Sequence, residues 1–164
     1  METKLKTELV KDLPNKKVTV KREFDAAPDL VWRAWTESKL LDKWWAPKPW
    51  AAKTKTLKFG EGGSWLYAME GPDGTKVWSI VEFNFIKRFN SFQATSFFCD
   101  ENGNKNPDFP SMHWKNNFIS SGTGTRVEVE ISFTNEADLK KIMDMGFEAG
   151  FTSALENLDE LLAQ

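Results

Sequence analysis

Hydrophobic and polar residues alternate over most of the chain after residue 50, and this alternation predicts β-strands. In the segment 125–133, Val127, Val129 and Ile131 alternate with polar residues. A period of two is typical of an antiparallel strand that buries one face. Further strands are predicted in the same way at 54–59, 64–69, 77–89, 91–99 and 112–120. Together the segments predict a six-stranded antiparallel meander.

The segment before the meander predicts one strand and two short helices. Apolar residues at alternate positions indicate a strand over 18–24. Pro28 suits the first turn of a helix, where its missing N–H would be unpaired in any case. That helix is expected to run to about Trp35. A second helix over 39–45 is expected to end before Pro47.

The C-terminal segment predicts one long helix. Asn135, followed three residues later by Asp138, resembles a capping box. Apolar residues then recur at intervals of three and four over 136–162, as on one face of a helix. Residues 1–15 are mostly polar, and we expect them to form a loosely ordered lead-in. The remaining residues, 16–164, are long enough for one domain with a substantial core.

This order of elements predicts an α+β fold. A meander with one apolar face must bury that face, and the last helix is the element long enough to cover it. We therefore expect a curved antiparallel sheet wrapped around the C-terminal helix, in the order β-α-α-β6-α. Gly146, Gly150 and Ala154 form one stripe on that helix, although a glycine within a helix costs about 1 kcal/mol relative to alanine. Close packing against bulky side chains or room for a ligand would explain the stripe.

Five of the eight tryptophans lie within nineteen residues, at 32, 35, 44, 45 and 50. Indole rings supply a large apolar area with one polar atom, so they build cores, interfaces and ligand sites. This cluster is either a packed corner of the core or the rim of an apolar cavity. If Trp44, Trp45 and Trp50 instead formed a contiguous exposed patch, they would indicate a site for a protein partner.

Several segments of the chain also resemble a known family. They are Phe24–Pro28, Val31–Thr36, Trp44–Lys48, Gly62–Trp65, Gly71–Gly74 and Gly146–Phe151, followed by Leu155 and Leu158. Their order and spacing are similar to those of the START-like (SRPBCC) helix-grip superfamily, and to its branch named for activators of the heat-shock-protein ATPase. The resemblance implies a single START-like domain. Members of the superfamily include carriers of lipids, hormones and polyketides, some cyclases, and chaperone-binding domains.

We expect any cavity to lie between the inward face of the sheet and the long helix. A small apolar or aromatic molecule would be its ligand, and the alternative function is a partner-binding module associated with a chaperone. Tyr67 and the indoles would supply the few polar atoms that such a pocket usually offers. The candidate ligand-binding residues are Trp32, Trp65, Tyr67, Trp78, Trp114, Met143, Phe147, Gly150 and Phe151.

The sequence offers few groups for catalysis. Cys99 and His113 could face each other across one hairpin and form a reactive dyad, but no flanking motif supports this. Acid–base chemistry would require two of Glu61, Glu70 and Glu82 to converge. We therefore expect no catalytic residue and a protein that is not an enzyme, although a cyclase that merely orients its substrate is an alternative.

Composition excludes several other classes. The formal net charge is −2, with acidic and basic residues interspersed, whereas binding of nucleic acid needs a basic face. One cysteine and one histidine do not suffice for a structural zinc site, so we expect no metal, and no cofactor is indicated. The N-terminus has no apolar signal segment, and no apolar run reaches the ~18 residues of a membrane span. These features predict a cytoplasmic protein.

Overall fold

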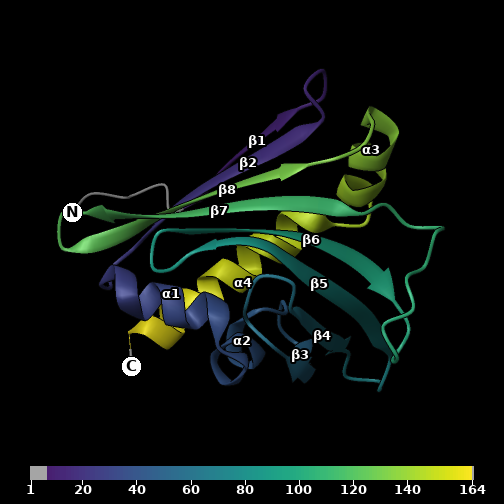
Figure 1. Cartoon of the computed structure of the whole chain (residues 1–164), viewed down its shortest axis with the longest axis horizontal. Helices are drawn as coiled ribbons and strands as arrows, with labels where there is room; N and C mark the ends of the chain where they lie inside the picture. The colour runs from purple at the N-terminus through teal and green to yellow at the C-terminus, as the bar shows by residue number, and fades with distance from the viewer. Residues whose placement is uncertain (1–6, 164) are drawn as a thin grey trace.

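The computed structural model describes residues 7–163, and its elements follow the order β-β-α-α-β6-α-α (Figure 1). The strands are β1 (Thr7–Asp12), β2 (Lys17–Phe24), β3 (Ala51–Leu57), β4 (Ser64–Glu70), β5 (Lys76–Lys87), β6 (Ser91–Cys99), β7 (Met112–Ser121) and β8 (Gly124–Ser132). The helices are α1 (Pro28–Thr36), α2 (Ser38–Trp44), α3 (Glu136–Asp144) and α4 (Phe147–Leu162).

The eight strands form one antiparallel sheet in the order β1-β2-β8-β7-β6-β5-β4-β3. The meander runs from β3 to β8, and β2 then pairs with β8, so that Val20 lies opposite Val129 and Val18 opposite Ile131. All four of these side chains are buried. The sheet curves, and α4 crosses its concave side (Figure 1). The predicted α+β helix-grip fold, with its six-stranded meander, is therefore confirmed.

The N-terminal segment differs from the prediction. Residues 7–12, expected within a loosely ordered lead-in, form β1 and pair with β2 over the whole of their length, from Thr7 opposite Arg22 to Asp12 opposite Lys17. The side chains of β1 are exposed or half-buried. Its hydrophobic pattern is therefore weak, and backbone hydrogen bonds to β2 define the strand. Residues 1–6 of the predicted lead-in lie outside the described residues.

The C-terminal helix is broken into two. Asn135 caps α3 as predicted, since its side chain accepts a hydrogen bond from the backbone N–H of Asp138 at 2.8 Å. The break is at Gly146, which has a φ of +89° and forms the N-cap of α4. L-residues with a side chain rarely adopt this conformation. The backbone at the break therefore explains this glycine, and the prediction of one continuous helix over 136–162 was wrong.

Two buried polar contacts fasten α4 to the rest of the molecule. Arg22 on β2 points toward the helix and is nearly fully buried, and its guanidinium pairs with the carboxylate of Asp159. Asn157 donates from Nδ2 to the backbone carbonyl of Ala46 at 2.9 Å, just beyond α2. Leu155 and Leu158 fill the apolar core beneath the same helix. The position of α4 above the sheet is thus set by both apolar and polar contacts.

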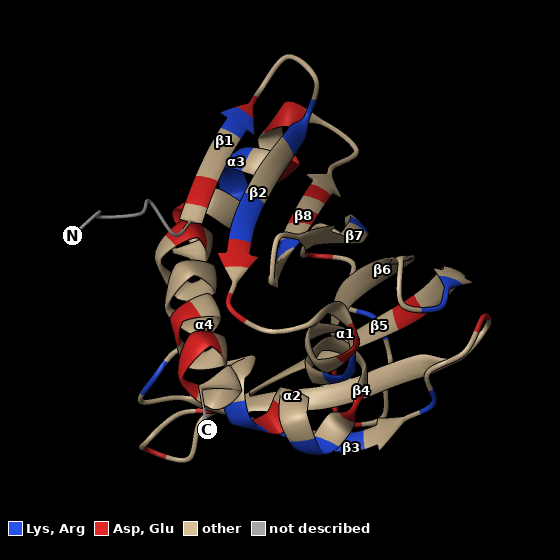
Figure 2. Ribbon diagram, turned by 90° about the vertical axis from the view of Figure 1, so that its left-hand side faces the viewer, with Lys and Arg blue, Asp and Glu red and all other residues tan. Residues whose placement is uncertain are grey.

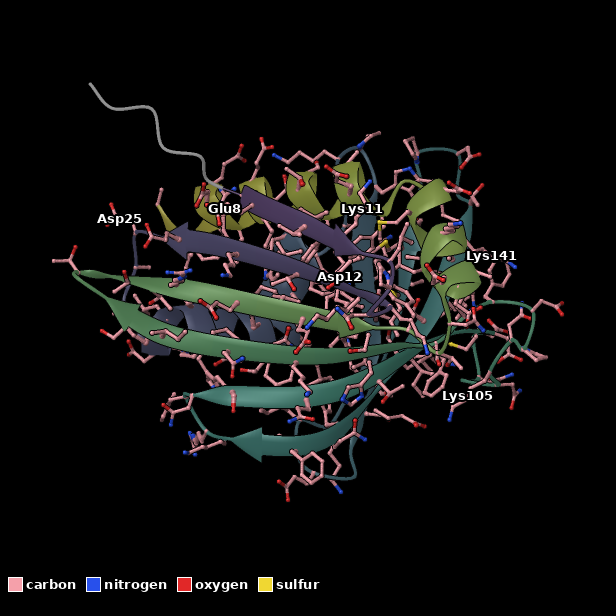
Figure 3. The ribbon with its side chains drawn as sticks, turned by 90° about the horizontal axis from the view of Figure 1, so that it is seen from above. Glu8, Lys11, Asp12, Asp25, Lys105 and Lys141 are labelled. Carbon is pink, nitrogen blue, oxygen red and sulfur yellow. The ribbon has the colours of Figure 1, made fainter. Side chains whose placement is uncertain are left out.

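The charged residues lie mainly on the outside of this framework. Figure 2 shows basic and acidic residues mixed along β1, β2 and α2. Seen from above, Lys11 lies beside α4, where its Nζ is 3.3 Å from a carboxylate oxygen of Glu148 (Figure 3). Within residues 7–163, no helix is long and apolar enough to cross a membrane. The same residues contain no cluster of His, Cys, Asp and Glu side chains that could hold a metal ion.

Candidate functional site

A cavity of about 250 Å³ lies between the concave face of the sheet and α4. Strands β4 to β7 supply one wall, and α4 with the segment from Trp35 to Pro47 supplies the other. Met145, which is 51% exposed, and the exposed Val77 also line the cavity.

The strands direct side chains into the cavity by simple alternation. On β4, Trp65 and Tyr67 point inward and their rings stack with centroids 4.1 Å apart. On β7, Trp114 and Asn116 point inward, while His113 between Met112 and Trp114 points to the other side of the sheet. This is the geometry expected of a strand, in which successive side chains point to opposite faces.

Trp45 is the centre of the aromatic wall. It follows α2, and its ring lies 5.5 Å from the ring of Trp65, 5.9 Å from that of Trp114 and 6.0 Å from that of Phe151. It also lies 5.8 Å from the ring of Trp35 on α1. Most of these pairs are edge-to-face, an arrangement that aromatic quadrupoles favour. The rings therefore hold one another in fixed orientations around the cavity.

Most polar atoms of the aromatic wall are paired within the protein. Trp45 Nε1 donates to the hydroxyl of Tyr67 at 2.9 Å, and Trp114 Nε1 donates to Ser96 Oγ at 3.0 Å. Trp65 Nε1 donates to Thr54 Oγ1 at 3.0 Å. Burial raises the pKa of Tyr67 above its usual value, although the hydrogen bond from Trp45 acts in the opposite direction. The phenol therefore stays neutral at physiological pH.

Two polar atoms on the cavity lining are exceptions. Trp35 Nε1 and Asn116 Oδ1 are buried and have no hydrogen-bond partner among residues 7–163. Trp35 is only 4% exposed and Asn116 only 3%. Buried polar groups in proteins are nearly always paired, since an unpaired one costs roughly 1–3 kcal/mol. Two residues of the lining thus each bury one unpaired polar atom, a donor at Trp35 and an acceptor at Asn116.

The structure brings most of the predicted site residues together. Six of the nine candidates line the cavity: Trp65, Tyr67, Trp114, Phe147, Gly150 and Phe151. Gly150 faces open space, because a Cβ placed there would only meet Pro47 Cγ at 3.8 Å.

Three candidates lie elsewhere. Trp32 packs in the core among Phe59, Phe92 and Phe118 and is not one of the residues that line the cavity. Trp78 points to the outer face, because its neighbours on β5 point inward, and its ring lies under Lys55 Nζ at 5.9 Å. Met143 lies on the side of α3 away from this cavity.

Sequence reasoning missed some important lining residues. Trp35 and Trp45 belong to the tryptophan-rich segment but were not among the candidates, since helix periodicity alone did not show which ring faces the sheet. Asn116 carried a usable signal, because it occupies an inward position between Trp114 and Phe118 in the alternating strand. A polar residue in such a position is unusual and indicates either an internal partner or a ligand.

The structure does not bring together the Cys–His pair considered above. Thr95 is the residue opposite His113, so Cys99 is four residues further along β6, about 13 Å away at 3.3 Å per residue. His113 contacts Thr95 and Gln93, at 3.2 Å and 3.3 Å. Burial raises the pKa of Cys99, whereas activation by a neighbouring histidine would lower it.

The three candidate glutamates do not converge either. Glu70 pairs with Lys53, and Glu82 pairs with Lys105. Glu61 accepts a hydrogen bond from the backbone N–H of Ile86. None of the three is among the residues that line the cavity.

Comparison with known proteins places this geometry in context. The model of the family described as activator of Hsp90 ATPase homolog 1-like protein matches residues 25–163. No curated protein matches the chain.

Solved structures of bacterial proteins match over nearly the whole chain. Protein Ms6760 from Mycobacterium smegmatis is 29% identical with a TM-score of 0.88, and the match covers 95% of this chain and 96% of that one. A protein from Arthrobacter aurescens is 30% identical with a TM-score of 0.90, over 95% and 91% of the two chains. Protein NE0264 from Nitrosomonas europaea is 27% identical with a TM-score of 0.81, over 92% and 96%.

The family model covers most of the chain, and each of the three structural matches covers more than nine-tenths of it. The resemblance that the sequence motifs indicated is therefore confirmed. The chain belongs to the activator of Hsp90 ATPase homolog 1-like family and has the helix-grip fold of a binding domain.

Proposed function

We propose that the protein binds a small hydrophobic or aromatic molecule, without converting it chemically, in the cavity between the sheet and α4. The observation that carries this proposal is the cavity itself, about 250 Å³ in volume and lined mostly by aromatic and aliphatic side chains. An apolar cavity of ~150 Å³ is sufficient to bind benzene. The space is therefore suitable for a ligand of one or two rings.

The placement of the titratable groups supports the non-catalytic part of the proposal. Catalytic sites usually bring such groups together with shifted pKa values in one pocket. Among the described residues, Tyr67 is the titratable group on the cavity lining, and its raised pKa keeps it protonated. Cys99, His113 and the three glutamates considered above lie outside the lining.

The alternative, a site for a protein partner, predicted an exposed patch made by three tryptophans. Trp44 is 0% exposed, and its Nε1 donates to the backbone carbonyl of Ala34 at 2.8 Å. Trp45 lines the cavity, and Trp50 packs on Gly71. These contacts favour an internal ligand over a partner that docks on this segment.

Gly150 provides a direct test of binding. A leucine at this position adds three carbons beyond Cβ at the cavity wall, whereas an alanine adds only the Cβ, for which there is room. Titration of naphthalene into the wild type, followed by tryptophan fluorescence, is expected to show saturable binding. Gly150→Leu should weaken binding by at least about tenfold, equivalent to 1.4 kcal/mol, while Gly150→Ala should leave it within about twofold.

Thermal unfolding of both variants without ligand serves as the control for folding. Native mass spectrometry of protein purified without denaturation would then reveal the mass of any natural ligand. Absence of saturable naphthalene binding to the folded wild type would contradict the proposal. Equal binding by Gly150→Leu and Gly150→Ala would place the site elsewhere.

A further inference from the structure

We propose that α3 is a gate of the cavity, and that three residues hold it shut: Lys141 on α3, and Asp108 and Phe109 in the loop between β6 and β7. We call these three residues the clasp. The inference rests on the proposed function and adds the path by which a ligand enters and leaves. It depends on the contacts that fasten α3 to the loop beside the cavity.

The clasp joins two elements that are far apart in the sequence. Lys141 Nζ donates to the backbone carbonyl of Asp108 at 2.7 Å, and it lies 4.8 Å from the ring centroid of Phe109. The ammonium group is attracted by the face of the aromatic ring. Phe109 in turn packs against Phe98 near the end of β6, with the two ring centroids 5.2 Å apart. The loop is thereby attached to β6 on one side and to α3 on the other.

Both sides of the clasp adjoin the lining of the cavity. Phe98, against which Phe109 packs, is a lining residue. On the other side, Ile142 and Met145 also line the cavity. Met145 follows Lys141 by four residues, a spacing that makes two side chains neighbours on a helix. Since Met145 is also half-exposed, the clasp connects the two walls of the cavity beside a lining residue that contacts the solvent.

The backbone after α3 supplies a hinge. Hinges are a few residues at the end of an element that absorb a change in φ and ψ. Gly146 separates α3 from α4 with a φ of +89°, and a Cβ added to it would meet nothing within 4 Å. α3 buries Leu139 and Ile142, whereas α4 buries five residues. α3 is therefore held less firmly than α4 and can move about Gly146 without it.

The clasp residues are separate from the ligand site. None of the three is among the described residues that line the cavity. Loss of the clasp therefore removes no contact with a bound ligand, but it increases the fraction of molecules in which α3 is open. Association and dissociation both pass through the open state, so both rate constants should rise by the same factor while Kd stays constant. A residue that contacts the ligand would change Kd instead.

Lys141→Met tests the gate, because methionine keeps an unbranched apolar side chain but lacks the ammonium group that contacts Asp108 and Phe109. Naphthalene is mixed with the wild type and with the variant, and tryptophan fluorescence is followed by stopped flow. NMR line shapes give the rate constants where exchange is too fast for mixing. We expect association and dissociation each to become at least about threefold faster, with Kd within about twofold of the wild type.

Lys140→Met is the matched control. Lys140 is the preceding residue on α3, is exposed and lies outside the cavity lining, so the same substitution removes the same charge and leaves the clasp intact. Its rate constants should equal those of the wild type. Phe109→Ala provides a second test from the loop, because it removes the ring that Lys141 and Phe98 both contact. This variant should also accelerate both steps, and circular dichroism checks that each variant is folded.

The outcomes separate the gate from the proposed function. If naphthalene binds and its rate constants are the same in the wild type, Lys141→Met and Phe109→Ala, the gate is wrong and the proposed function stands. Faster dissociation alone, with a weaker Kd, would also overturn the gate, because the clasp would then stabilise only the bound state. An equal acceleration in Lys140→Met would overturn it as an effect of charge. If naphthalene does not bind, the proposed function and the gate both fail.

Discussion

Replacement of Asn116 by leucine should stabilise the protein, although most substitutions in a core destabilise. Asn116 is 3% exposed, and its Oδ1 has no partner within the described chain. Leucine has a similar size and shape but no polar atom. The substitution therefore removes the penalty of a buried, unpaired group without creating a large cavity.

The expected gain is about 1–2 kcal/mol in the free energy of unfolding, somewhat below the ~1–3 kcal/mol penalty of an unpaired buried group, because leucine must adapt to a site shaped for an amide. For a chain of this length, each kcal/mol corresponds to roughly 2–4 °C in Tm.

Asn157 offers a matched control. It is also a buried asparagine, 8% exposed, but its Nδ2 donates to the carbonyl of Ala46 at 2.9 Å. Asn157→Leu removes that bond and leaves the carbonyl unpaired, so it should destabilise the protein by about 1–3 kcal/mol. The same chemical change is therefore expected to have opposite signs at the two positions.

Urea unfolding, followed by both tryptophan fluorescence and circular dichroism, measures the two free energies. The m-values should stay unchanged, so that the shift in midpoint reports stability. A loss of stability in Asn116→Leu comparable to that in Asn157→Leu would refute the reasoning, because it would mean that the Asn116 amide makes favourable interactions in the free protein.

Two further predictions concern the ion pair of α4 and the single thiol. Asp159→Asn should destabilise the protein by about 3 kcal/mol, since it leaves the guanidinium of Arg22 buried without its charge partner, whereas Glu160→Gln in an exposed pair should change stability by less than about 0.5 kcal/mol. Equal losses of stability in the two variants, measured by urea unfolding, would contradict this prediction. Cys99 should titrate above the usual pKa of a thiol, and therefore react slowly at neutral pH, with no change in His113→Ala. A low pKa that depends on His113 would restore the dyad.

The sequence predicted the fold well because the fold depends on local patterns. The alternation in β8 and the cap at Asn135 are encoded within a few residues, and both are confirmed. β1 was missed because its side chains have little burial pattern, and only pairing with β2 defines it. The break at Gly146 depends on a positive φ, which a glycine permits but does not require.

The site was predicted less completely, because it depends on which face of each element is turned inward. Trp65, Tyr67 and Trp114 were found, since alternation assigns the inward face of a strand. Trp78 was assigned to the wrong face, because β5 is long and its apolar residues are not confined to one side. Trp35 lies on a helix, and its unpaired indole nitrogen could be recognised only from three-dimensional contacts.

The most direct test of the account uses the tryptophans as built-in reporters. In a ¹⁵N-labelled sample, each indole N–H gives its own NMR signal, and substitution of single tryptophans assigns the signals. Titration with naphthalene should shift the signals of Trp35, Trp45, Trp65 and Trp114, which line the cavity, and should leave Trp78 on the outer face unchanged. A saturable titration that shifts Trp78 but not Trp35 would contradict the account.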